Sequence, residues 1–256
     1  MAGVSLRRKH KLSDLIVEDV KRRIVSDRLK PGDRLPNEKD LIEQYGCAKG
    51  TVREALKGLE VEGLIVTKTG PTGGAYLTQP TVDHAARALR NFLHFQHLDG
   101  DQIYQLRILI EEEVAASVVG RLSENDFRAL EDNIALCAHP PQDEEEQRTQ
   151  RIAELEFHNM LAALCPNPLL AFLGRFLNDL LRDLVVLKKV YLPARGQFGE
   201  ANLDYHRRLL DAYRREDEAT VRRLMREHMC DAHDHLHALE GEVAKRFLLD
   251  GPPHGH

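Results

Sequence analysis

Residues 31–74 read PGDRLPNEKDLIEQYGCAKGTVREALKGLEVEGLIVTKTGPTGG, and their pattern determines the fold of the N-terminal part of the chain. Pro31-Gly32 ends an amphipathic helix that the apolar spacing predicts over residues 12–29. Asn37 is a good N-cap for a short second helix, which ends at Gly46. A third helix follows at once, because apolar residues recur there at helical spacing: Val52, Ala55, Leu56 and Leu59.

After the third helix, the sequence predicts a β-hairpin with strands over 64–67 and 75–77 and a glycine-rich turn between them. Three helices followed by a hairpin form a winged helix-turn-helix, which we assign to residues 1–80. A helical linker is expected over 81–98. Beyond the linker, helical periodicity alternates with proline- and polar-rich breaks. This pattern predicts an antiparallel all-helical bundle over residues 99–250. The fold class is therefore mainly α.

Composition narrows the class of protein. The 256 residues carry a net charge of −5, yet residues 1–80 hold 15 Lys+Arg against 11 Asp+Glu, a net +4 that leaves −9 for the rest. The basic end is where a polyanion would bind.

No apolar run approaches the roughly 18–20 residues of a membrane span, so we expect a cytoplasmic protein. Four cysteines without CxxC spacing argue against a thiolate zinc site and structural disulfides.

The start of the third helix points to DNA binding. In a helix-turn-helix, the second helix of the pair lies in the major groove and its first residues reach bases and phosphates. The wing can enter the adjoining minor groove. Each cation taken alone can equally be a solvated surface charge, but together they favour DNA. The expected contacts are Lys39, Lys49, Gly50, Thr51 and Arg53, with Lys68 and Gly70 in the wing.

The quoted stretch resembles the winged-helix signature of the GntR family of bacterial transcription regulators. The match runs through Pro31-Gly32, Leu35-Pro36, Glu38, Leu41, Gly46, Thr51-Val-Arg-Glu-Ala-Leu56 and Gly63-Leu64. The resemblance implies that the same seven residues approach operator DNA. Two features depart from the family pattern: Ala48 replaces the usual hydroxyl, and Lys39 and Lys49 stand where arginine is common. Lysine keeps the charge but loses bidentate recognition of guanine.

A second constellation lies in the predicted bundle. Glu154 and His158 are four residues apart, which places both on one helix face. His206 and His228 lie in later predicted helices, beside apolar residues that would turn them inward. One carboxylate and three neutral imidazoles suit Zn²⁺, Ni²⁺ or another borderline divalent ion. The alternative, an ordinary surface or core role for each residue, stays open because such pairs are common.

The region from about residue 99 to 240 resembles the FCD effector domain of the FadR subfamily, through LRILIEEEVAASVVGRL, AELEFHNMLAALCPNPLL and YHRRLLDAYRREDEATVRRLMREH. Many members carry a metal, and the resemblance implies that Glu154, His158, His206 and His228 hold it here. The family residue at the first position is usually Asp, so Glu154 reaches about one bond further. The bundle is expected to take a small organic acid, whose carboxylate would meet the metal and Arg107.

Arg107 also stands out from the residues alone. It lies in the apolar run Leu106–Ile110, where an inward guanidinium needs an anionic partner. The alternative is an exposed arginine paired with Glu111 at i+4. In the last predicted helix, the 100° rotation per residue places His233 and His237 away from His228, so both are expected to face solvent.

These observations predict a ligand-responsive transcription regulator, more specifically a repressor, rather than an enzyme. A homodimer is expected, because two recognition helices related by a two-fold axis read both halves of a palindromic operator. Two alternatives use the same four residues of the bundle: a metal-dependent enzyme, and a sensor for which the metal itself is the effector. Against the enzyme alternative, the sequence offers no separate acid or base for catalysis, and an enzyme would not explain the winged helix.

Overall fold

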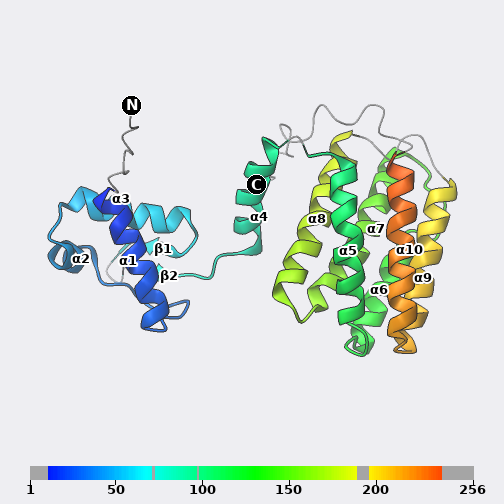
Figure 1. The fold of residues 1–256 in the computed structure, drawn as a ribbon, viewed down its shortest axis with the longest axis horizontal. Helices are drawn as coiled ribbons and strands as arrows, with labels where there is room; N and C mark the ends of the chain where they lie inside the picture. Colours follow the sequence, from blue (N-terminus) through cyan, green and yellow to red (C-terminus); the bar gives the residue numbers. More distant parts are fainter. Residues whose placement is uncertain (1–10, 71–72, 97, 189–195, 238–256) are drawn as a thin grey trace, which may run out of the picture. The chain divides into compact units, whose positions relative to one another are not determined.

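The computed structural model describes residues 11–70, 73–96, 98–188 and 196–237, and the chain divides into two units, 1–89 and 90–256 (Figure 1). The first unit contains α1 (Leu12–Ser26), α2 (Glu38–Tyr45), α3 (Lys49–Val61), β1 (Ile65–Lys68) and β2 (Gly74–Leu77). The two strands pair antiparallel, with Ile65 opposite Leu77 and Lys68 opposite Gly74. The expected winged helix-turn-helix is therefore present.

A small apolar core joins the elements of the first unit. Ile16 and Val20 of α1 pack with Ala55 and Leu59 of α3 against Ile65 at the start of the hairpin. All five are buried because each lies on the inward face of its helix or strand. This core holds α3 by one side and leaves the opposite side of its first turns to solvent.

The segment after α1 adds a feature that the hydrophobic pattern did not predict. Helix α1 ends at Ser26 rather than at Leu29, because Arg28 has a left-handed φ of 52° that stops the helix. The chain then runs along β2: the amide of Leu35 donates to the carbonyl of Ala75, and the amide of Leu77 donates to that of Asp33, at 2.9 and 2.8 Å. The wing is thus tied to the segment that leads into α2.

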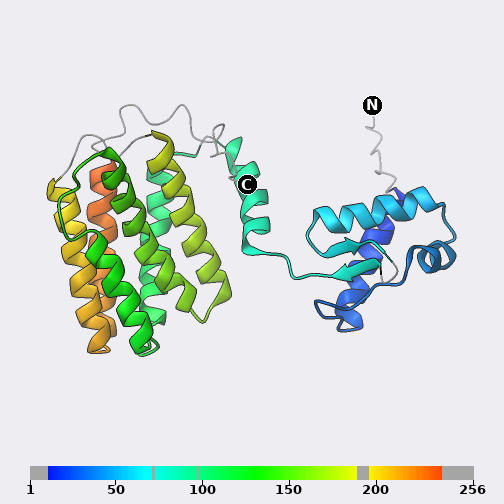
Figure 2. The ribbon, with the colours of Figure 1, turned by 180° about the vertical axis from the view of Figure 1, so that it is seen from behind.

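The second unit is a bundle of helices lying side by side, seen from two opposite sides in Figures 1 and 2. Helix α4 (Val82–His94) crosses the division between the units. The bundle helices are α5 (Gly100–Ser117), α6 (Glu124–Leu136), α7 (Glu144–Leu164), α8 (Pro168–Lys188), α9 (Gly196–Arg214) and α10 (Glu218–His237). Helix α5 packs mainly on α10 and α8, and α7 packs on α8 and α6. The described residues of this unit form helices and no strand, as the sequence predicts.

Two helices begin earlier than their apolar periodicity predicts. The apolar periodicity of α7 starts only at Ile152, and the charged segment 143–150 before it can by sequence be a loop or a helix start. Helix α7 begins at Glu144, because the Asp143 side chain caps it by accepting from the amide of Glu146 and three glutamates favour its first turn. Helix α9 begins at Gly196, not at Leu203. In the sequence, the apolar periodicity of the last helix continues to Phe247, and this continuation lies outside the described residues.

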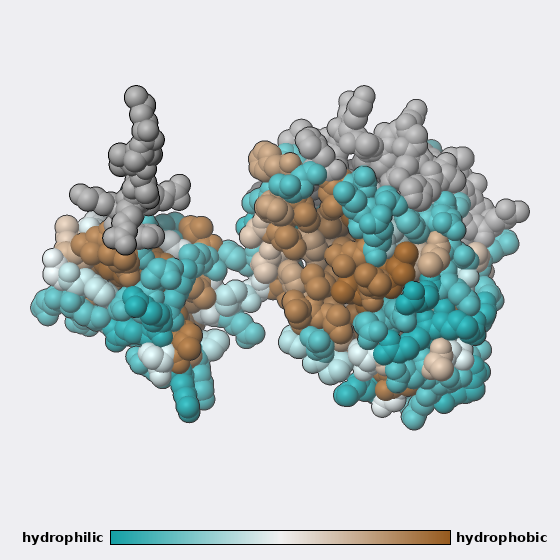
Figure 3. Space-filling view, in the orientation of Figure 1, coloured by the Kyte–Doolittle hydropathy of each residue, from teal (hydrophilic) through white to brown (hydrophobic). Residues whose placement is uncertain are grey.

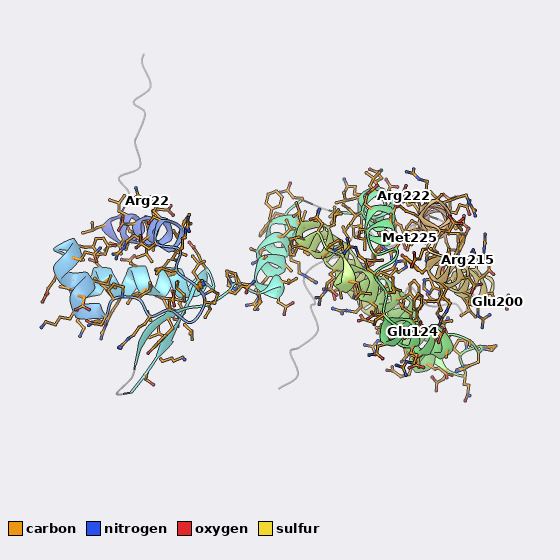
Figure 4. The ribbon with its side chains drawn as sticks, turned by 90° about the horizontal axis from the view of Figure 1, so that it is seen from below. Arg22, Glu124, Glu200, Arg215, Arg222 and Met225 are labelled. Carbon is orange, nitrogen blue, oxygen red and sulfur yellow. The ribbon has the colours of Figure 1, made fainter. Side chains whose placement is uncertain are left out.

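The bundle core consists of large apolar side chains from α5, α6, α7, α9 and α10. Phe157 and Leu161 of α7 and Leu209 of α9 are fully buried there, and the Tyr213 hydroxyl donates to the carbonyl of Ala115 at 3.0 Å. Met225 of α10 is also buried, whereas Arg222, on the same helix, reaches out to Glu113 of α5 at 2.7 Å; both are labelled in Figure 4. The same helices also carry buried polar side chains, among them Arg107, Glu111 and His158.

Candidate functional site

The turn between α2 and α3 sets the direction of the third helix. Asn37 and Asp40 form a reciprocal capping box at the start of α2, and Gly46 ends the helix with a φ of 58°. Such a left-handed position favours glycine, because any Cβ there strains the backbone. Helix α3 starts three residues later with Ala48 as N-cap, and no side chain caps it. The first amide groups of α3 are therefore available to an anion.

The expected DNA contacts on α3 lie at its exposed beginning. Lys49, Gly50 and Arg53 are exposed and Thr51 is half-buried, while Val52 faces the core. Nothing lies within 4 Å of a Cβ built on Gly50, so this surface is open. The structure thus brings Lys49, Gly50 and Arg53 to one exposed end of the helix.

Glu38 holds two of these cations and was not singled out as a site residue from the sequence. Its carboxylate lies 3.0 Å from Arg53 Nε and 3.3 Å from Lys49 Nζ. The hydrogen bond from Arg53 is the main reason why the pKa of Glu38 lies below its usual value. Its place as the first residue of α2, inside the quoted signature, is the signal that could have identified it. Glu38 links the start of α2 to the exposed end of α3.

The remaining expected contacts lie on either side of α3. Lys39 is exposed at the start of α2, with its Nζ 4.0 Å from Glu43. In the wing, Lys68 Nζ lies 4.8 Å from the centre of the Tyr76 ring, and Gly70 is exposed with a φ of 102°. The Arg34 guanidinium also lies near this ring and donates to the carbonyl of Gly73. The wing therefore presents a cation on an aromatic platform.

In the bundle, the structure brings together three of the four expected metal ligands. Each of His158, His206 and His228 offers a ring nitrogen within 4.8 Å of the others, and all three are buried. His158 Nε2 and His228 Nε2 are 3.3 Å apart. Among the described residues, His206 Nε2 and His228 Nδ1 have no hydrogen-bond partner. Helices α7, α9 and α10 each supply one imidazole.

The electrostatics of the cluster favour neutral imidazoles. Burial lowers the pKa of His206 and His228 well below the usual histidine value, and the neighbouring histidines and the Arg107 guanidinium add to this shift. Burial also lowers the pKa of His158, although Glu111 partly opposes the effect. Neutral imidazole is the form that binds a metal ion. Three buried neutral imidazoles, two of which have a ring nitrogen without a partner among the described residues, fit a borderline divalent cation.

Glu154 points to different partners. Its carboxylate accepts from Arg151 Nη1 at 2.7 and 2.9 Å and from Asn202 Nδ2 at 3.0 Å. Burial raises its pKa, and Arg151 and Asn202 oppose that shift only in part. Glu154 shares the α7 face of His158, as its i,i+4 spacing predicts, but its carboxylate is not within the group formed by the three imidazoles.

Arg107 is buried, as expected for an inward guanidinium, and it also lies near Glu111, as the i+4 alternative predicts. Its side chain is only 3% exposed, and its Nε donates to Asn178 Oδ1 at 3.0 Å and lies 3.7 Å from Glu111 Oε1. It is close enough to lower the pKa of all three cluster histidines. The structure therefore places one buried cation beside the imidazoles.

Glu111 and Asn178 are the polar residues of this region that the sequence did not identify as part of the site. Glu111 Oε2 lies 3.1 Å from His158 Nδ1, and both side chains are almost fully buried. The only sequence signal for Glu111 was its i+4 spacing from Arg107. No sequence pattern connects Asn178, on α8, to either residue.

The expectation that His233 faces solvent is wrong. Its ring stacks on Tyr104 with centroids 5.5 Å apart, and its Nε2 lies 2.6 Å from Asp101 Oδ1. The helix angle placed it correctly away from His228, but α5 packs against that side of α10. The side chain of His237 lies outside the described residues.

The family comparisons agree with this architecture. A model described as "FCD domain" matches residues 102–231, more than half of the chain, and one described as "Bacterial regulatory proteins, gntR family" matches residues 12–72. No helix in the described part of the chain is long and apolar enough to cross a membrane.

Curated relatives match along most of the chain. The "HTH-type transcriptional regulator LutR" of Bacillus subtilis (strain 168) is 27% identical over 214 residues, which cover 83% of this chain and 95% of that protein. The "HTH-type transcriptional repressor NanR" of Citrobacter rodentium is 26% identical over 256 residues, covering 95% and 94%. These relatives are regulators, not enzymes.

A solved structure described as "Streptococcus agalactiae GntR" is similar in fold, with a TM-score of 0.56 and 20% identity; the match covers 87% of this chain and 99% of that one. The two domain matches follow each other in the chain in the same order as the winged helix and the bundle. The chain therefore belongs to the GntR family and is a DNA-binding transcription regulator with a C-terminal FCD domain.

Proposed function

We propose that the chain is a dimeric repressor whose bundle senses a small carboxylate at a divalent-metal site. The observation that carries the proposal is the buried cluster of three neutral imidazoles beside the buried guanidinium of Arg107. The name of the NanR relatives, transcriptional repressor, supports the direction of regulation. In this proposal residues 1–80 bind DNA, 81–98 link the domains and 99–250 form the effector domain.

The metal would be held by His158, His206 and His228, with Glu154 as the fourth ligand. Zn²⁺ and Ni²⁺ suit this donor set. Glu154 has to leave Arg151 and Asn202 to take part, so its contribution is the weakest of the four. A bound ion would offer a Lewis-acid position to the carboxylate of the effector. Arg107 would provide the second, bidentate contact.

Elemental analysis of single variants tests the metal site. His158→Ala, His206→Ala and His228→Ala are each expected to lose most of the metal, whereas the exposed His139→Ala is expected to keep it. Full occupancy in all three cluster variants would exclude a shared site. Glu154→Ala is expected to weaken binding less than any imidazole substitution, because its carboxylate is engaged elsewhere.

For the DNA interface we propose Lys39, Lys49, Gly50, Thr51 and Arg53 as the contacts of the recognition region, with Lys68 and Gly70 in the wing. Arg53→Ala is expected to weaken operator binding by about 1–3 kcal/mol at fixed salt. Arg215→Ala is the matched control, because it removes the same charge from an exposed position in the bundle (labelled in Figure 4). Equal effects of the two substitutions would contradict the assignment.

For the dimer we propose the apolar surface over α5 and α8 as the contact between two copies. Figure 3 shows a broad hydrophobic area on this side of the bundle. The exposed leucines of these two helices include Leu106 and Leu109 of α5 and Leu169 of α8, which are 43%, 58% and 64% exposed. A second copy is the occupant that a two-fold operator requires. Leu109→Asp is expected to shift sedimentation from dimer to monomer, and an unchanged dimer would exclude this surface.

A thermal-shift screen of small carboxylates against the metal-loaded protein tests the effector class. A shift that depends on both the carboxylate and the metal supports the proposal. Changes in DNA affinity caused by metal alone, with no further response to any carboxylate, would instead identify the ion as the effector.

A further inference from the structure

Glu111 is an acidic residue on α5 that lies beside the histidine cluster and is not one of the four expected metal ligands. Its side chain is 1% exposed, and its Oε2 lies 3.1 Å from His158 Nδ1 on α7. Its other oxygen lies 3.7 Å from Arg107 Nε and, among the described residues, has no hydrogen-bond partner. Burying a carboxylate this deeply costs several kcal/mol unless neighbouring groups compensate, so its position has to be explained by its contacts.

The contact with His158 defines which atom carries the proton. Glu111 Oε1 lies 3.7 Å from Arg107 Nε and Glu111 Oε2 lies 3.1 Å from His158 Nδ1, so the carboxyl group lies between two basic groups, a position that favours its ionised form. An ionised carboxylate can only accept a hydrogen bond. His158 Nδ1 is therefore the donor, and the lone pair of this imidazole lies on Nε2.

The orientation of the His158 ring directs the Nε2 lone pair toward the other imidazoles. His158 Nε2 faces His228 Nε2 at 3.3 Å, on the side of the ring directed at the cluster. His228 differs, because its Nδ1 has no hydrogen-bond partner among the described residues. In the metal-free protein, His228 Nε2–H can donate to His158 Nε2. Among the described residues, no carboxylate accepts from the other ring nitrogen of His228, so nothing fixes its tautomer. Glu111 thus acts on His158 in particular.

We propose that Glu111 is a positioning residue that holds His158 as the Nδ1–H tautomer, with Nε2 directed at the other two imidazoles, so that the metal site is assembled before the ion arrives. This inference rests on the proposed metal site. Partners that orient a ligating histidine in this way commonly change metal affinity by about 10–100-fold. Glu111 itself is not a ligand in this scheme, since its hydrogen bond goes to the far nitrogen of the ring.

Two substitutions at Glu111 test the role, with one matched control. Glu111→Gln keeps the shape and one acceptor oxygen, whereas Glu111→Met keeps the length and removes the acceptor. Glu113→Gln is the control, because it lies on the same helix but is exposed and pairs with Arg222. Circular dichroism and sedimentation of each variant establish that it is folded before it is compared.

The first measurement uses the metal-free protein. Long-range ¹H–¹⁵N spectra identify the protonated ring nitrogen of His158, with His158→Gln providing the assignment. We expect Nδ1–H in the wild type and in Glu113→Gln, and a gain of the Nε2–H form in both Glu111 variants, larger for Glu111→Met. An Nε2–H tautomer in the wild type, or no change in either Glu111 variant, would overturn the proposal.

The second measurement is Zn²⁺ affinity by competition with a chromogenic chelator. We expect a loss of about 10–100-fold in Glu111→Met, a smaller loss in Glu111→Gln and none in Glu113→Gln. Wild-type affinity in Glu111→Met would also overturn the role of Glu111. A wild-type protein that binds no Zn²⁺ but shows the expected tautomer would refute the proposed metal site instead, so the two failures are distinguishable.

Discussion

The burial of His206 predicts how the stability of the metal-free protein depends on pH. Its ring stacks on Phe157 with centroids 3.9 Å apart, and burial holds its pKa well below the usual value. In the unfolded chain the same imidazole titrates near about 6.5. Between pH 7.5 and 5.5 the unfolded state therefore takes up a proton at this position and the folded state does not. The free energy of unfolding must fall as the pH falls through this window.

The magnitude follows from the linkage relation. A histidine that stays neutral in the folded state and has a pKa of about 6.5 when unfolded lowers the free energy of unfolding by about 1.4 kcal/mol between pH 7.5 and 5.5. His228, which is shifted in the same direction by the same burial, adds a similar amount. The substitution His206→Gln removes one of these contributions and leaves the other in place.

The assay is urea unfolding of the bundle, followed by circular dichroism in the presence of a chelator at pH 7.5, 6.5 and 5.5. The wild type is expected to lose about 1.4 kcal/mol more than His206→Gln across this range. His139→Gln is the control for the loss of an imidazole outside the cluster, because the His139 side chain is 54% exposed. Identical pH dependence in the wild type and His206→Gln would refute the reasoning.

Three further predictions concern the DNA-binding unit and Arg107. Ala48→Ser places a hydroxyl at the uncapped, extended N-cap of α3 and is expected to stabilise the first unit by about 0.5–2 kcal/mol; a thermal melt without any gain would contradict it. Lys68→Ala is expected to weaken binding evenly across DNA sequences and to reduce the salt slope by about one, so a sequence-selective loss would count against a phosphate contact. Arg107→Lys keeps the charge but loses the planar fork, so DNA binding without effector should persist while the response to effector falls; equal loss of both would indicate a structural role.

Much of the fold is encoded in local sequence patterns. The helices of the first unit follow from apolar spacing, and their ends follow from particular residues, as at Asn37 and Gly46. These signals act within a few residues, because capping bonds and left-handed turns depend only on the neighbouring backbone. Local signals leave the charged segment 143–150 as either a loop or a helix start, and the cap at Asp143 decides for the helix although this segment has no apolar stripe. Helical spacing also correctly placed Glu154 and His158 on one face of α7.

The long-range partners of the polar side chains were decided only by the tertiary structure. Glu154 of α7 accepts from Asn202 of α9, 48 residues further along the chain, and His158 of α7 meets Glu111 of α5, 47 residues before it. A periodic pattern defines the face on which a residue lies, but not the helix packed against that face or the rotamer that the contact selects. His233 shows the same limit, since Asp101 covers it from α5. Sequence alone therefore specified the elements and the donor types, whereas the packing of α5, α7, α9 and α10 decided that the three imidazoles meet and that Glu111 lies beside His158.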